Sequence, residues 1–168
     1  MKEFFINHYM KIGWAIAILN LIMIINSTWF FLGMLKFSVI AWLYFNACAP
    51  SVVIYLVGFF SGRREIMAAS MPSLFFFGGV GLFVFSWSGT SLVPQAGHIL
   101  MVTAIVYTAM VTAMEKIWKK TLTGFIIGLV FFAIFLPFQQ RYVKEHPEYV
   151  KKLGDPAFEE LINKNRGN

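Results

Sequence analysis

The sequence predicts an all-α protein, an integral membrane bundle of five transmembrane helices with a short helical C-terminal tail. Of its 168 residues, 58% are hydrophobic and only 13% are charged, whereas about a quarter of the residues of a soluble domain are charged. The apolar residues also gather in runs of about 20 or more, the length that a helix needs to cross a bilayer. We therefore expect membrane lipid to surround most of the chain.

Five apolar runs predict the five spans. The predicted spans are residues 12–35, 37–60, 66–87, 93–113 and 121–138, and residues 139–168 form an amphipathic tail outside the membrane. The first two runs together are too long for one helix, so a tight turn near Gly33 and Lys36 must separate them. Pro94 falls in the first turn of the fourth span, where a missing N–H is tolerated.

The tail contains two helix-start patterns, His146–Pro147 and Asp155–Pro156, because proline favours the first position of a helix. Two alternatives stay open for this tail. It forms short helices on the membrane surface or against a partner, or it is a mobile solvated segment.

Positive residues predict the orientation. The N-terminus and two of the loops carry Lys2, Lys11, Arg63, Arg64, Lys116, Lys119 and Lys120. The other two loops contain only Lys36 as a positive residue. The positive-inside rule therefore places the N-terminus in the cytoplasm and the C-terminus outside the cell, for a protein of the plasma membrane. The tail adds four positive residues to the outer side, Arg141, Lys144, Lys151 and Lys152. They reduce the difference in positive charge between the two sides of the membrane. The net charge of +6 is thus explained by topology and lipid headgroups, and we expect no nucleic-acid partner.

The stretch FNACAPSVVIYL, residues 45–56, interrupts the second span. Pro50 donates no backbone N–H, and its ring clashes with the carbonyl of Asn46, so the helix should bend there. Lipid does not satisfy the freed carbonyls, but Ser51 or a neighbouring amide can do so. We therefore expect this segment to face the interior of the bundle.

The spans carry neutral polar residues and no charged residue near their centres. Because intramembrane charges usually mark ion-coupled sites, a proton- or sodium-driven pump is disfavoured. The candidates for a polar cavity or kink are Asn20, Asn26, Asn46, Pro50, Ser51, Tyr107, Thr108 and Thr112. Each of the amide and hydroxyl residues among them also has a simpler interpretation, as a hydrogen bond between helices. Both interpretations stay open, and a cavity would bind a small neutral solute or a lipid headgroup.

Small residues predict where helices approach closely. Candidate packing positions are Gly78, Gly79, Gly81, Gly124 and Gly128, the last two forming a GxxxG pair. Such faces serve contacts within one chain or between chains.

Motifs for catalysis and cofactor binding are missing from the sequence. It has no CxxC pair, phosphate-binding loop, nucleophile elbow or paired carboxylates, so we expect no enzyme, no cofactor and no metal site. Cys48 is interpreted as a small buried residue. His8, His98 and His146 have no ligand constellation around them. Glu3, Glu65 and Glu115 stand beside basic residues and are interpreted as solvated loop charges.

Two functional hypotheses remain. The first is a channel or transport protein for a small neutral or weakly charged solute, working as a homo-oligomer. The alternative is a non-catalytic membrane subunit of a larger respiratory or transport complex, with partner membrane subunits. Substrate and oligomeric state are not encoded in any motif.

Overall fold

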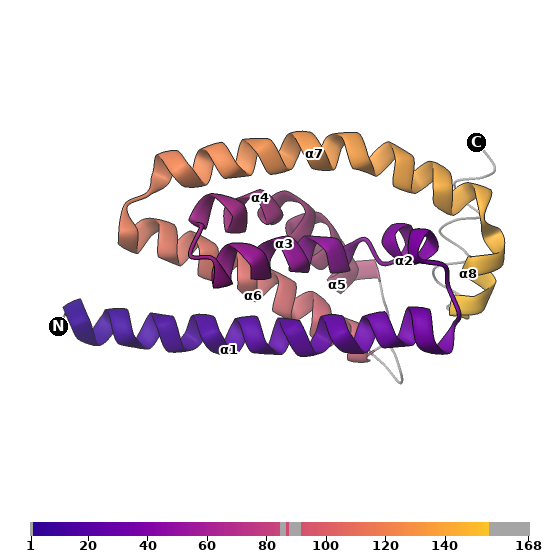
Figure 1. The fold of residues 1–168 in the computed structure, drawn as a ribbon, viewed down its shortest axis with the longest axis horizontal. Coiled ribbons are helices and arrows are strands. Elements are labelled where there is room, and N and C mark those ends of the chain that lie inside the picture. Colours follow the sequence, from indigo (N-terminus) through magenta and orange to yellow (C-terminus); the bar gives the residue numbers. More distant parts are fainter. Residues whose placement is uncertain (1, 85–86, 88–91, 155–168) are drawn as a thin grey trace.

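A computed structural model describes residues 2–84, 87 and 92–154, with side chains from His8 onward (Figure 1). These residues are almost entirely helical and include no strand. In chain order the helices are α1 (Lys2–Thr28), the π-helix η1 (Trp29–Met34), α2 (Val39–Phe45), α3 (Cys48–Phe60), α4 (Arg64–Leu74), the π-helix η2 (Phe75–Gly79), α5 (Val80–Val84), α6 (Leu92–Glu115), α7 (Trp118–Glu145) and α8 (Pro147–Leu153). The predicted all-α bundle is confirmed.

Four continuous helical stretches in the described residues are long and apolar enough to cross a membrane: His8–Met34, Arg64–Val84, Leu92–Glu115 and Trp118–Glu145. A fifth span requires α2 and α3 to count as one broken span, because their axes differ by 87°. Helix α7 extends to Glu145, beyond the predicted end of the fifth span at residue 138. Pro137 lies inside it without ending it.

The helices α1 and α7 lie on opposite sides of the bundle, with α3 and α4 between them (Figure 1). Helix α4 packs against both α3 and α7, and α1 contacts α3 and α6. The apolar windows of α1 and α7 are only 11% and 6% buried inside the chain. Apolar helices so exposed are typical of contact with lipid tails.

Glycines allow α7 to lie directly on α4. A Cβ added at Gly124 would overlap the backbone of Glu65, and one added at Gly128 would overlap the backbone of Ala69. The GxxxG pair therefore serves a contact within the chain, one of the two uses expected of it. Such a close approach increases van der Waals contact between membrane helices, where burial of apolar area contributes little.

We call the end of the bundle where α1 begins the N-terminal end, and the other the distal end. At the distal end the chain leaves η1 and turns at Lys36, which has a left-handed φ of 55°. The tail helix α8 packs on this turn: the rings of Phe37 and Tyr149 are 4.5 Å apart, and the Lys152 ammonium lies 5.9 Å from the Phe37 ring.

The predicted helix start at His146–Pro147 is thus occupied by α8, which rests on its own chain. The second predicted start, Asp155–Pro156, lies outside the described residues.

Candidate functional site

The second predicted span is two helices rather than one bent helix. Helix α2 ends at Phe45, Asn46 leaves the helical conformation with φ −119° and ψ 50°, and α3 begins at Cys48. Pro50 therefore falls in the first turn of α3, where its missing N–H is harmless. Starting a new helix avoids the clash between the Pro50 ring and the carbonyl of residue 46 more completely than a bend would.

Polar groups at this break are bonded within the chain. The Asn46 side chain is buried, and its Nδ2 donates to Ser27 Oγ of α1 at 2.7 Å. The Ser51 hydroxyl donates to the Ala47 carbonyl at 3.2 Å. On the opposite side, Gln139 Nε2 of α7 donates to the Tyr44 carbonyl at 3.1 Å. The break is therefore tied to both outer helices.

The other predicted polar residues are spread along the bundle rather than gathered in one site. Asn20 is buried and its amide donates to the carbonyls of Ile16 at 2.9 Å and Leu100 of α6 at 3.4 Å. Thr108 and Thr112 donate to carbonyls one turn earlier on α6. Asn26 lies on the exposed side of α1.

Three predicted packing glycines lie in η2 and α5, where two of them contact α6. A Cβ at Gly78 would lie 2.9 Å from Met101 Cβ, and a Cβ at Gly81 would lie 2.5 Å from the His98 ring. No described atom lies within 4 Å of a Cβ built at Gly79. The His98 ring is therefore held against the backbone of α5, with its Nδ1 3.0 Å from Gln95 Oε1.

The N-terminal end holds a cluster of charged and polar side chains from three helices. Arg64 of α4 and Glu115 of α6 form an ion pair at 3.1 Å, with a second contact from Arg64 Nε to Glu115 Oε2 at 3.3 Å. The Tyr9 hydroxyl of α1 donates to Glu115 Oε1 at 3.2 Å. The Arg64 and Glu115 side chains are 17% and 29% exposed, so the pair is partly shielded from solvent. We call these three residues the Tyr9–Arg64–Glu115 cluster.

Two buried tyrosines lie near this cluster and form what we call the tyrosine pair. The Tyr55 and Tyr107 side chains are 0% and 2% exposed. Neither hydroxyl has a hydrogen-bond partner among the described residues. Tyr107 lies about two helical turns before Glu115 on α6. Two buried donors of this kind are unusual, because nearly all buried polar groups in proteins are bonded.

Apolar contacts hold the tyrosine pair in place. The Phe59 ring, one turn after Tyr55 on α3, packs against both partners, with ring centroids 6.3 Å and 6.0 Å away. The Tyr107 hydroxyl reaches α1 at Gly13, where a Cβ would overlap it. Helices α1, α3 and α6 thus position two hydroxyls in an otherwise apolar layer.

Sequence reasoning missed most of this site. The interpretation of Glu115 as a solvated loop charge is incomplete: the residue is exposed at the end of α6, but Arg64 and Tyr9 bind its carboxylate. One signal was available: the predicted topology places Arg64 and Glu115 on the same side of the membrane. Nothing in the sequence around Tyr55 distinguishes a buried tyrosine from one that lies at the membrane interface.

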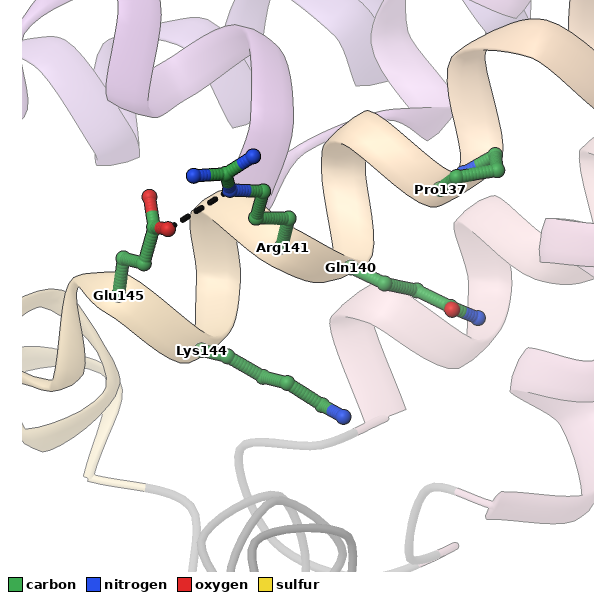
Figure 2. A pocket seen from close by; sticks show the side chains of 5 residues that line it. All are labelled: Pro137, Gln140, Arg141, Lys144 and Glu145. Carbon is green, nitrogen blue, oxygen red and sulfur yellow. Dashed lines mark hydrogen bonds and ion pairs between the residues drawn. The ribbon is translucent and has the colours of Figure 1, made fainter.

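A shallow hollow lies on α7 near the distal end (Figure 2). The described residues that line it are Pro137, Gln140, Arg141, Lys144 and Glu145. They all belong to one helix, and Arg141 pairs with Glu145 at 2.8 Å beside the hollow. Because α7 alone supplies these residues, the hollow is a helix surface rather than an enclosed binding site.

Among the described residues no three His, Cys, Asp or Glu side chains gather in a way that could hold a metal ion. No family model, no curated protein and no solved structure matches this chain. The candidate site is therefore defined by its own geometry: a partly shielded ion pair between α4 and α6 to which Tyr9 of α1 is hydrogen-bonded, and beside it two buried hydroxyls.

Proposed function

We propose that this chain transports a small neutral solute that forms hydrogen bonds, working in an assembly of several copies with the N-terminal end in the cytoplasm. The observation that carries the proposal is the tyrosine pair. A buried hydroxyl without a partner costs about 1–3 kcal/mol of stability. A solute with hydroxyl or amide groups would offset this penalty at both Tyr55 and Tyr107.

The charges nearby favour a neutral solute. Arg64 and Glu115 already neutralise one another, so neither is left to bind a counter-ion. A charged solute would in addition lose its hydration in an apolar layer, which costs far more than desolvating a neutral one.

The Tyr9–Arg64–Glu115 cluster fits the role of a closure at the cytoplasmic end. It joins α1, α4 and α6 at the end nearest the tyrosine pair. A partly exposed ion pair contributes only about 0.2–1 kcal/mol, so it can separate without much loss of stability. Its separation would free three helices to move apart.

Solute flux into proteoliposomes tests this proposal. Vesicles containing the protein should equilibrate glycerol or urea faster than empty vesicles, as followed by light scattering after an osmotic step. The double variant Tyr55→Phe/Tyr107→Phe should lose most of that flux, because it keeps both rings and removes both hydroxyls. The matched control is Tyr44→Phe, which keeps the ring stacked 4.5 Å from Tyr142 at the distal end.

Flux in the double variant equal to that of the parent chain would overturn the assignment to the tyrosine pair. Parent vesicles that equilibrate neither solute faster than empty ones would overturn the transport proposal itself.

A second candidate function, a non-catalytic subunit of a larger membrane complex, is favoured by the outer helices. The apolar windows of α1 and α7 are only 11% and 6% buried, which leaves two long faces for partner subunits. Gentle extraction from the native membrane tests it. A subunit would migrate with other proteins in fixed stoichiometry, and migration without them would exclude this function.

A further inference from the structure

Helix α1 presents a polar side chain on the side that faces away from the bundle. Its inner face is made by Gly13, Ala17 and Asn20, which are buried against the other helices. Asn26 lies on the other side and is exposed. Its amide makes no hydrogen bond with any side chain or backbone group among the described residues.

The position of Asn26 along α1 places it within the hydrocarbon layer. Lys11 and Lys36 flank the span. At a rise of ~1.5 Å per residue, Asn26 is roughly 22 Å from Lys11 and roughly 15 Å from Lys36. When Lys11 and Lys36 both lie at the membrane interfaces, Asn26 lies between them at the depth of the lipid tails. Its surroundings there are lipid tails or another helix. Lipid tails offer an amide no hydrogen bond, so a protein partner at this depth is strongly preferred.

The residues around Asn26 form one exposed stripe along the helix. Ala15, Leu19, Ile22, Asn26 and Trp29 follow each other at intervals of four, three, four and three residues. All five are exposed. This spacing places all five residues on one face of the helix, and a single asparagine in a seam between paired helices commonly fixes its register and partner number.

We propose that two copies of this chain pair through this seam, with α1 of one copy parallel to α1 of the other and the two Asn26 amides hydrogen-bonded to each other. A second copy is the occupant that the geometry favours. Both copies insert in the same orientation, so a two-fold axis along the membrane normal brings each residue opposite its own equivalent. An amide carries both a donor and an acceptor, so it complements itself.

This inference deepens the proposed function, since it names the contact that would build the assembly of copies. It rests on the proposed function only for what the assembly does, and the pairing itself is argued independently. Its test measures association alone. Dimers without solute flux would overturn the transport proposal and leave the seam intact, whereas flux without dimers would do the reverse.

Disulfide cross-linking in native membranes tests the geometry. In a Cys48→Ala background, Ile22→Cys and Asn26→Cys should form cross-linked dimers on oxidation. Leu21→Cys is the matched control, because Leu21 is 38% exposed but points about 140° away from Asn26 and about 100° away from Ile22. Cross-linking at Leu21 equal to that at the seam positions, or cross-linking at none of them, would overturn the proposal.

The role of the amide is tested on the full chain in detergent micelles at several dilutions. Asn26→Leu should lower the association constant by about three- to thirtyfold, the effect of losing one hydrogen bond between membrane helices. Asn26→Gln, which keeps the amide, should stay closer to the parent chain. An unchanged association constant in Asn26→Leu would overturn the inference. So would a different protein that copurifies with the parent chain but not with Asn26→Leu.

Discussion

Replacing Gly128 by alanine should separate α7 from α4. The added Cβ would overlap the Ala69 carbonyl oxygen, which belongs to backbone and cannot rotate away as a side chain would. The matched control is Gly79→Ala. The same methyl group is added there, at another helical glycine, and no described atom lies within 4 Å of it.

Two opposing terms set the magnitude. Alanine is preferred over glycine inside a helix by up to about 1 kcal/mol, and this gain applies at both positions. At Gly128 it is opposed by overpacking, which costs about 1–3 kcal/mol in well-packed interiors. Gly128→Ala should therefore be about 1–3 kcal/mol less stable than Gly79→Ala, a difference of roughly 2–12 °C in Tm for a chain of this size.

Thermal unfolding in detergent micelles, followed by helical circular dichroism, measures this difference. Gly124→Ala should behave like Gly128→Ala, since its Cβ would overlap the Glu65 backbone. A Gly128→Ala protein with the Tm of Gly79→Ala would refute the reasoning, because it would mean that α4 and α7 do not approach at their glycines.

Three further predictions concern the polar contacts. Tyr107→Phe should raise the free energy of unfolding by about 1 kcal/mol in the absence of solute, because it removes a buried hydroxyl with no partner; a loss of stability in thermal unfolding would show that the hydroxyl is bonded. Asn46→Leu should lower stability by about 0.5–1.5 kcal/mol. Adding Ser27→Ala to that variant should cost little more, because the hydrogen bond is already lost. Losses that simply add in this double-mutant cycle would show that the two side chains do not interact. Glu115→Gln should lower stability by less than about 1 kcal/mol and abolish part of the dependence of Tm on salt concentration, and a salt dependence equal to that of the parent chain would contradict the role of the ion pair.

The helical bundle could be predicted from sequence because the signals for it are local. A run of apolar residues long enough to cross a bilayer appears within one window, and the turn at Lys36 was expected from the length of the first two runs. Pro50 predicted a bend in this span, and the structure instead ends one helix at Phe45 and begins the next at Cys48, with Pro50 in its first turn. The separation of α2 from α3 by 87° was not predictable, because the angle depends on what each helix contacts after the break.

The Tyr9–Arg64–Glu115 cluster depends on contacts between residues far apart in sequence. Arg64 and Glu115 are 51 positions apart, and Tyr9 and Glu115 are 106 apart. Topology places all three at one end of the bundle but says nothing of which helices are neighbours there. Arg63, next to the pairing arginine, has the same local signal, so composition alone could not choose between them.

The state of the polar groups at the two ends argues for placing the solute contact at the N-terminal end. At the break, Asn46, Ser51 and Gln139 each have a partner within the chain, so a solute binding there would have to displace bonds already formed. At the tyrosine pair, Tyr55 and Tyr107 have none among the described residues, so a solute would add hydrogen bonds without breaking any. Because net affinity is the difference between bonds gained and bonds lost, the proposed function assigns the break to holding α1 and α7 together and the tyrosine pair to the solute.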